Sequence, residues 1–458
     1  MTSKIEPANC TPLNRSRGIS YQELLDTDSK PVPQVLRLES SSTLDVGHTQ
    51  PEVYFSPEFH RLEMERIWLR VWQFACREEV VPEVGDTEVY SIGNYSAIIV
   101  RTASDEIKAF PNACLHRGRV LRDTGGRVTE LRCPFHGFAW NLDGTLKFVP
   151  SKWDFPQLDE ENFNLTELPV GRWAGFVFIS FNQDVQPFEE FIGDLPEHFN
   201  QWLLEDRYTD VHVAKVLRCN WKVGQEAFME AFHVTATHPQ AVPGSGDENS
   251  QYDIFGNFSR AITPTGISSP NLRWKATENE ILDILVDRGL EEDRVVEVPP
   301  GTTARELTAA ATRAGLGTII GDAPAELLSD AELVDNIYYT LFPNFHPWGS
   351  FNRIVYRFRP YGNDPEMSIF DIFLLAPFNG ERPQPASVQW LGPDESMLKA
   401  PQLGVLARIF DQDTFNLPRV QQGLHNRSLD NRGVLLSSYQ ESKIQHFYAL
   451  YQRHLEGS

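Results

Sequence analysis

Long apolar segments are missing from this 458-residue sequence. No apolar run approaches the ~20 residues that a membrane-spanning helix needs, and the opening residues MTSKIEPANC lack the apolar core of a secretory signal. These two absences predict a cytoplasmic protein that does not enter a membrane.

Cysteine and positive charge are also scarce. Five cysteines without regular spacing argue against a disulfide scaffold, so a cysteine that matters here would be a metal ligand or a nucleophile. Lys and Arg total 41 against 63 Asp and Glu, a net charge of -22 that repels nucleic acid and anionic lipid. We therefore expect no nucleic-acid partner.

The length predicts more than one unit, because a single core rarely serves a chain of this size. Residues 1–50 read as an N-terminal arm that packs on another surface, such as that of a neighbouring subunit. A leading helix after Ser56, continuing through EFHRLEMERIWLRVWQF, and short β-branched runs indicate an all-β unit over 51–183.

Residues 184–458 read as an α+β unit. The pattern predicts a strand at 210–219, a helix opening at Asn220, a hairpin with PYGNDPE as its turn, and a C-terminal helix with one apolar face at 444–455. Residues 285–330 form an acidic excursion. Three glycines at 315, 317 and 321 have the wrong spacing for a dinucleotide fingerprint, and we interpret them as a loop after a helix.

Two cysteines and two histidines form the first candidate site. Cys114-x-His116 is followed, after sixteen residues, by Cys133-x2-His136. A Rieske-type [2Fe-2S] cluster needs two Cys on one iron and two His on the other, and each of these segments offers one ligand of each kind. Structural zinc is the rival, since Cys2His2 also closes a tetrahedron, but zinc modules more often pair two cysteines in the first segment. We expect Cys10, Cys76 and Cys219 to be inert.

Two more histidines form the second candidate site. A non-haem Fe(II) site needs two His and one carboxylate, with other positions open. His233 and His238 lie five residues apart, about 140° around an ideal helix, so they reach one ion only if the helix ends or bulges between them. The carboxylate must come from elsewhere: Asp413 is our choice and Asp411 the alternative. The remaining eight histidines show no matching spacing.

With these sites, the sequence resembles the large (alpha) subunit of Rieske non-haem iron aromatic-ring-hydroxylating oxygenases, from about residue 50 to 440. The segments that carry the resemblance are CLHRGRVL, CPFHGFAWNLDGTL, NWKVGQEAFMEAFHVTATH and FDQDTFNLPRVQQGL. The resemblance implies an α+β chain with an all-β Rieske domain and a helix-grip catalytic domain, in which an antiparallel sheet wraps a long helix. It also implies a homotrimer or an α3β3 assembly with a small subunit.

The resemblance further implies a role for Glu230. The family has a carboxylate three residues before the first iron-binding His, which links that His to a cluster His of the next subunit. Here the linking pair would be Glu230 and His136, and the usual Asp is replaced by the longer Glu. Bridge geometry is therefore the point at which this chain departs from the family pattern.

The function that follows is that of a terminal oxygenase component. It would take electrons from NAD(P)H through a separate reductase, with or without a ferredoxin, to the cluster and then to Fe(II). It would use O2 to hydroxylate, or dihydroxylate, an aromatic or other apolar substrate. The alternative is a monooxygenase or demethylase acting on an apolar or quaternary-amine substrate. We expect the substrate cavity to include Phe228, Phe232, Val234 and Phe410.

Two rival classes need fewer of these features. A pure electron-transfer Rieske protein needs only the first site, which leaves the 260 or so residues beyond it unexplained. A zinc-stapled binding protein without redox chemistry would be colourless.

Overall fold

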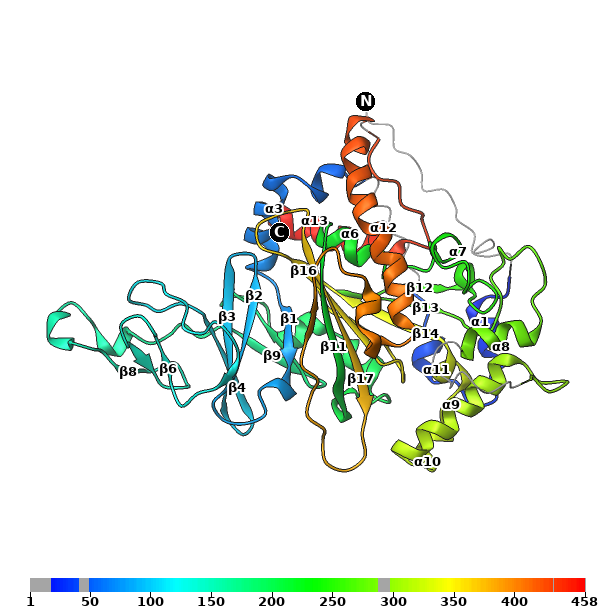
Figure 1. Ribbon diagram of the computed structural model, residues 1–458, viewed down its shortest axis with the longest axis horizontal. Helices are drawn as coiled ribbons and strands as arrows, with labels where there is room; N and C mark the ends of the chain where they lie inside the picture. The colour runs from blue at the N-terminus through cyan, green and yellow to red at the C-terminus, as the bar shows by residue number, and fades with distance from the viewer. Residues whose placement is uncertain (1–17, 41–48, 287–296, 431, 458) are drawn as a thin grey trace.

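The computed structural model describes residues 18–40, 49–286, 297–430 and 432–457. Small strands of the N-terminal half lie at one end of the molecule, and helices α8 Glu278–Val286, α9 Ala304–Ile320 and α10 Asp322–Ala325 lie at the other (Figure 1). Within the described ranges, no helix is both long and apolar enough to span a membrane.

The all-β lobe contains two small sheets around its own core. One is ordered β4-β3-β2-β5 and the other β6-β7-β8. Their bounds are β2 Asp86–Ile92, β3 Tyr95–Ala103, β4 Glu106–Pro111, β5 Gly126–Arg127, β6 Leu131–Arg132, β7 Ala139–Trp140 and β8 Leu146–Phe148. Apolar side chains of β3, β4, β6 and β7 pack in one core with Cys114 and Cys133. The lobe therefore buries both cysteines among its own strands.

A third small sheet joins this lobe to the rest of the chain. It is ordered β1-β10-β9, with β1 Gln73–Arg77, β9 Val170–Trp173 and β10 Phe176–Ile179. Phe74 and Phe178 of this sheet meet Phe345 edge to face, and Phe74 also contacts Phe373, far along the sequence. Residues on both sides of position 183 therefore share one hydrophobic core.

A five-stranded sheet is the main element of the C-terminal half. Its order is β15-β16-β17-β11-β18, with β11 Arg207–Leu217, β15 His346–Pro347, β16 Ile354–Pro360, β17 Ser368–Pro377 and β18 Gln389–Leu391. The expected strand and hairpin are confirmed, since β16 pairs with β17 in antiparallel register. All pairs are antiparallel except β11 with β18. A further sheet contains β12 Gln251–Ile254, β13 Phe258–Thr263 and β14 Asn336–Leu341.

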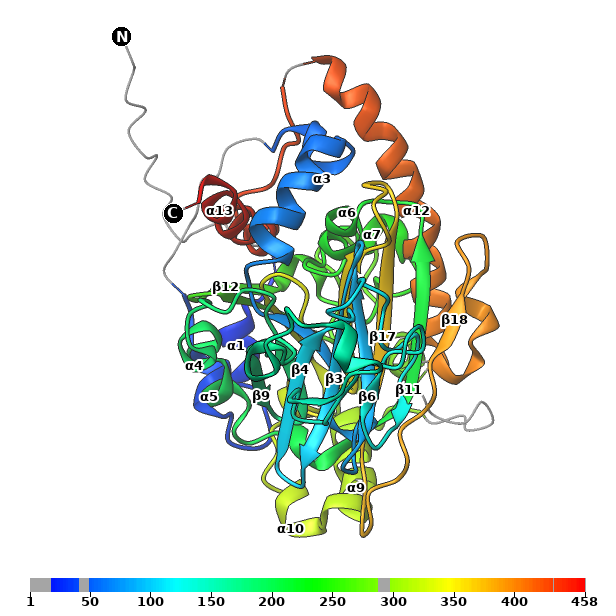
Figure 2. The same cartoon turned by 90° about the vertical axis from the view of Figure 1, so that its left-hand side faces the viewer.

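Helices α6 Trp221–Glu226 and α12 Leu406–Arg427 pack on the five-stranded sheet, whereas α13 Ser442–Glu456 packs on β12 and β13 (Figures 1 and 2). The buried face of α12 has a residue every three or four positions, as one packed helix face requires: Ala407, Phe410, Thr414, Leu417, Gln421 and Leu424. The helices expected at Asn220 and near the C-terminus are confirmed, and Asn220 caps α6 by accepting from the Lys222 N–H at 2.9 Å.

The leading helix is shorter than predicted. It comprises α3 Pro57–Glu63 and a π-helical turn Met64–Trp68, after the cap at Ser56. The prediction that it continues through Phe74 is wrong, because Gln73–Arg77 pair with β10 as a strand. That pairing depends on residues about a hundred positions away and has no local signal.

The excursion forms a helical unit with a core of its own. It contains α8 Glu278–Val286, α9 Ala304–Ile320, α10 Asp322–Ala325 and α11 Asp330–Val334. Ile281, Leu282 and Leu285 pack against Ala304 and Ala309 in a core separate from the sheets. Gly315 and Gly317 lie inside α9, so the prediction of a loop there is wrong; only Gly321 lies past its end.

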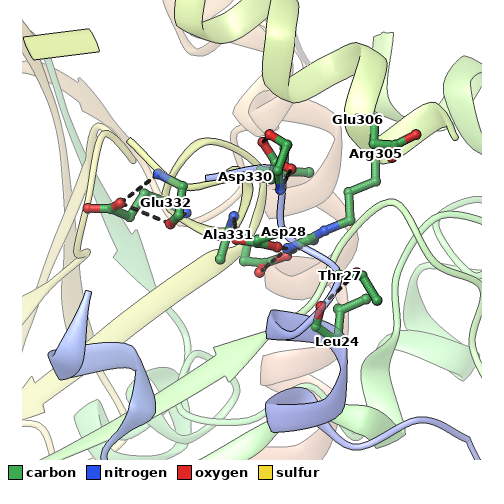
Figure 3. Close-up of polar contacts among 12 residues, drawn as sticks. Leu24, Thr27, Asp28, Arg305, Glu306, Asp330, Ala331 and Glu332 are labelled. Atoms are coloured by element: carbon green, nitrogen blue, oxygen red, sulfur yellow. Dashed lines mark hydrogen bonds and ion pairs between the residues drawn. The ribbon is translucent and has the colours of Figure 1, made fainter. Parts of the chain in front are cut away.

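The described part of the N-terminal arm packs on its own chain. It contains the short helices α1 Tyr21–Leu25 and α2 Gln34–Arg37. After α1, Asp28 accepts a hydrogen bond from the Ala331 N–H at 2.8 Å and lies 3.4 Å from Arg305 (Figure 3). Arg305 also forms a bidentate ion pair with Asp335, at 2.5 and 2.9 Å. Residues 18–40 thus fasten the helical unit to the body through buried charges.

The Asp28 contact predicts a pH effect on stability. Burial raises the pKa of Asp28 from 3.8 to about 6, although Arg305 opposes the shift. The folded chain therefore binds a proton on Asp28 more tightly than the unfolded chain does. This proton binding stabilises the fold fully below the unfolded pKa of 3.8, and the stabilisation is lost as the pH rises through about 6. Asp28→Asn cannot ionise and keeps an oxygen to accept the Ala331 N–H.

We expect the free energy of unfolding of wild type to fall by roughly 2 kcal/mol relative to that of Asp28→Asn as the pH rises through that window. Urea unfolding of both proteins at several pH values measures the difference. A constant difference across the window would contradict the shift.

Candidate metal centres

Two loops of the all-β lobe have the same backbone design. The Cys114 N–H donates to the carbonyl of Arg119, and the Cys133 N–H donates to that of Phe138, each at 2.8 Å. Gly118 and Gly137, each four residues after its cysteine, donate back to the cysteine carbonyl. Both glycines have positive φ, +75° and +85°, which side chains disfavour. The loops therefore present their cysteines in matching ways.

The loops bring like ligands together. Cys114 and Cys133 are both buried, and the pKa of Cys114 is raised by burial and by its contact with Cys133. The imidazole rings of His116 and His136 lie 4.7 Å apart between centroids. Nδ1 of His116 is buried without a hydrogen-bond partner. A metal ion would satisfy that atom, so the four side chains fit a cluster whose two irons take different ligands.

A single tetrahedral ion fits these four residues less well. One ion needs its four ligand atoms close to one another. Among the described residues, one group of at least three His, Cys, Asp or Glu ligands lies within 4.8 Å, and it does not include the four residues of the loops. The two cysteines form one pair and the two histidines form another. Two separate ligand pairs suit the two irons of a cluster better than a single zinc ion.

The second candidate centre consists of His233, His238 and Asp413, whose ligand atoms all lie within 4.8 Å of one another. His233 precedes the short helix α7 Val234–Thr237 and His238 ends it. The helix thus ends between the two rings as the spacing required, and their centroids lie 5.2 Å apart. Asp413 comes from α12; its Oδ1 lies 2.9 Å from Nε2 of His238 and 3.5 Å from Nε2 of His233.

Neighbouring polar groups orient both imidazoles. Glu230 Oε1 lies 2.5 Å from Nδ1 of His233, and its Oε2 accepts the His233 backbone N–H at 3.0 Å. Nδ1 of His238 lies 2.9 Å from Oε1 of Gln412. These contacts orient both rings so that Nε2 of each faces Asp413. With a metal ion bound, Glu230 and Gln412 would keep the proton on Nδ1 and leave Nε2 as the ligand atom. Such outer partners commonly set the orientation of metal-binding histidines.

The two candidate carboxylates differ in their contacts. Asp411 accepts hydrogen bonds from Ser396 Oγ at 2.7 Å and from the Met397 N–H at 2.8 Å, so it caps a 3₁₀ turn. Asp413 instead contacts the two histidines. The geometry favours Asp413 as the third ligand.

The charges at this centre suit a cation. Burial alone would lower the pKa of His233, but the carboxylates of Glu230 and Asp413 raise it to about 10. Burial likewise opposes ionisation of Asp413, yet His233 and His238 lower its pKa below the usual value. Without metal, a proton balances the two carboxylates; a divalent ion would take the place of that proton.

The triad opens onto a cavity of about 970 Å³. Phe228, Val234 and Phe410 line it, as the sequence led us to expect. Phe232 does not, and its side chain is 52% exposed. The segment 227–233 is an irregular turn, so helical spacing does not describe which of its side chains face the cavity.

Sequence reasoning missed several contributors. Gln412 has no pattern that marks it as a partner of His238. Tyr356 of β16 and Thr312 of α9 also line the cavity, and both come from elements whose position depends on the tertiary fold. The hairpin predicted around PYGNDPE indicated the strand at 354–360 but not which of its faces lines the cavity.

Comparisons with known proteins agree with this arrangement. The chain matches the family model "Ring hydroxylating alpha subunit (catalytic domain)" over residues 198–457 and "Rieske [2Fe-2S] domain" over 71–159. The anthranilate 1,2-dioxygenase large subunit of Acinetobacter baylyi is 30% identical over 195 residues, 41% of each chain. Chloroplastic choline monooxygenase of Beta vulgaris is 29% identical over 197 residues, 42% of this chain and 44% of its own. These matches span about two fifths of each curated relative.

Solved structures share the fold over most of the chain. A quaternary ammonium Rieske monooxygenase aligns with a TM-score of 0.63 at 17% identity, covering 89% of this chain and 95% of that one. A naphthalene 1,2-dioxygenase mutant aligns with a TM-score of 0.61 at 19% identity, covering 88% and 91%.

Fold and sites together define a two-centre metalloprotein, with an all-β Rieske domain joined to a mixed helix and sheet domain that holds a mononuclear site. The chain belongs to the family of ring-hydroxylating oxygenase alpha subunits. Its Rieske and catalytic domains are those of proteins that carry a [2Fe-2S] cluster and a non-haem iron.

Proposed function

We propose that this chain is a terminal oxygenase component that uses O2 to hydroxylate, and in our preferred version dihydroxylate, an aromatic or other apolar substrate. The observation that carries the proposal is the triad of His233, His238 and Asp413, whose ligand atoms lie within 4.8 Å and face a cavity large enough for an organic molecule. Two His and one carboxylate leave other positions of an iron open.

Each residue has a defined part in this proposal. Cys114, His116, Cys133 and His136 would hold the [2Fe-2S] cluster, and the triad would hold Fe(II). When bound, the cluster supplies single electrons and the ferrous ion supplies the activation of O2. Glu230 and Gln412 keep protons on Nδ1 of their histidines, and the apolar wall around Phe228 and Phe410 excludes water from the substrate.

The arrangement within one chain supports an assembly of several copies. Figure 1 shows β6 and β8, beside the cluster loops, at one end of the molecule, whereas α7 and α12 lie on the other side of the five-stranded sheet. His136 is exposed. We therefore propose a trimer, with or without small subunits, in which His136 of one copy faces Glu230 of the next. A reductase, with or without a ferredoxin, would supply electrons from NAD(P)H.

Product mass tests the function. Purified protein, a generic reductase and a panel of aromatic compounds are incubated under ¹⁸O2. Two labelled oxygens in the product support dihydroxylation, and one labelled oxygen supports the monooxygenase alternative. Absence of labelled product from every compound, with both metal centres filled, would contradict the proposal.

Glu230 provides a separate prediction. Glu230→Gln keeps the length of the side chain but removes the negative charge beside Nδ1 of His233, so His233 becomes a weaker ligand. We expect the affinity of the metal-free triad for Co²⁺ to fall about tenfold to a hundredfold. Glu248→Gln, a half-buried Glu outside the site, is the control. Equal Co²⁺ affinity in all three proteins would show that Glu230 does not support the ligand.

A further inference from the structure

The cavity extends far beyond the three candidate metal ligands. Its volume of about 970 Å³ lies at the upper end of small-molecule sites, the range that accommodates drug-sized ligands. On one side, Phe228, Tyr356 and Phe410 present aromatic rings, with 5.0 Å between the first two ring centroids and 5.8 Å between the last two. This side of the cavity offers a broad apolar surface next to the triad.

Helix α9 forms another wall. Its lining residues recur every three or four positions, which places them on one face: Thr308, Ala311, Thr312, Gly315, Leu316 and Ile319. The middle of this face carries short side chains. Ala311 and Gly315 are exposed to the open space beside this wall, so longer side chains at these two positions would occupy part of that space.

Gly315 has no packing reason to be glycine. A glycine inside a helix costs up to about 1 kcal/mol relative to alanine. At Gly315 an added Cβ would meet no atom within 4 Å, and the backbone is helical. Gly317 of the same helix differs, because a Cβ there would lie 2.6 Å from Oδ1 of Asp322. Gly317 thus serves the contact with α10, whereas Gly315 leaves space in the cavity.

Buried ion pairs hold α9 in place beside the cavity. Arg305, near the start of α9, is held by Asp335 and Asp28 (Figure 3). Arg313, two residues before Gly315, donates to Asp330 at 2.8 Å. Both arginines are buried. These two buried ion-paired arginines fix the position of α9, so the helix does not move into the cavity.

The charges on the lining indicate the kind of occupant. Among the described residues that line the cavity, the carboxylates are Glu230 and Asp413, and both serve the triad. Beyond the triad, the cations on the lining are Arg353 and Arg408; both are exposed, and Arg353 is paired with Asp210. Among the described lining residues no further carboxylate is left to bind an ammonium group, and the aromatic side of the cavity suits a neutral apolar body.

We propose that α9 sets the size limit of the cavity and that the substrate is a large, multi-ring apolar molecule rather than a single ring or a small ammonium compound. This inference rests on the proposed function. It assigns Ala311 and Gly315 as the residues that determine size selectivity.

The test fills the space with a leucine. Gly315→Leu is compared with Ala310→Leu, which adds a leucine to the exposed, opposite face of the same helix. Pyrene and toluene are the probes, and binding is measured by fluorescence with the metal centres filled. We expect wild type and Ala310→Leu to bind pyrene more tightly than toluene. Gly315→Leu should lose at least about tenfold in pyrene affinity and keep its toluene affinity within about twofold.

Unchanged pyrene affinity in Gly315→Leu would overturn the inference, as would wild type binding toluene as tightly as pyrene. Ala311→Phe, on the same face, gives a second measurement if Gly315→Leu fails to fold. Measuring labelled-oxygen incorporation distinguishes a failure of the size-limit inference from a failure of the proposed oxygenase function. Oxygenation of toluene without pyrene binding refutes only the size limit, whereas selective pyrene binding without oxygenation of any compound refutes the proposed function.

Discussion

Replacing His233 with Ala is expected to abolish substrate-dependent O2 consumption while leaving the visible spectrum of the cluster unchanged. The remaining His238 and Asp413 are too few to hold a ferrous ion in a three-ligand site. We expect activity to fall by at least about a thousandfold, several kcal/mol in the barrier. The two centres come from separate parts of the chain, so the loss should be confined to one of them.

An oxygen electrode and an absorbance spectrum of the same sample measure both effects. His425→Ala is the control, because His425 is exposed and pairs with Glu366 away from the triad. Substrate-dependent O2 uptake by His233→Ala at the wild-type rate would remove His233 from the site.

Cys114→Ser is expected to give the opposite pattern. A serine oxygen is a poor substitute for the thiolate that a cluster iron requires, so the variant should lose the brown colour and two of its irons. The triad does not depend on Cys114 and should keep its single iron. The expected iron content is therefore about one per chain, against about three in wild type.

Cys219→Ser is the matched control. Cys219 is buried beside Ser368, at 3.9 Å between Sγ and Oγ, so a hydroxyl has a partner there. This variant should keep its colour and iron. A coloured Cys114→Ser protein with wild-type iron content would show that the cluster, or its ligand, lies elsewhere.

Local patterns were sufficient where the chemistry is local. The pairs Cys114 with His116 and Cys133 with His136 lie close in sequence, and each pair lies in a tight loop that contains a glycine with positive φ. His233 and His238 were expected to need a helix end between them, and α7 ends there. In each case the residues that determine the geometry are neighbours along the chain.

Contacts between distant parts of the chain could not be predicted in the same way. The sequence favoured Asp413 but left Asp411 as the alternative. The contacts of Asp413 with the two histidines and of Asp411 with Ser396 and Met397 distinguish them. The strand at Gln73–Arg77 depends on its partner β10, and the residues before it looked helical. Phe232 was expected in the cavity because its neighbours are apolar, but an irregular turn exposes it.

Metal and sulfide analysis of anaerobically purified protein tests the central claim most directly. We predict about three iron atoms and about two labile sulfides per chain, with little zinc. About one zinc per chain with no iron or sulfide would contradict the assignment of both metal centres.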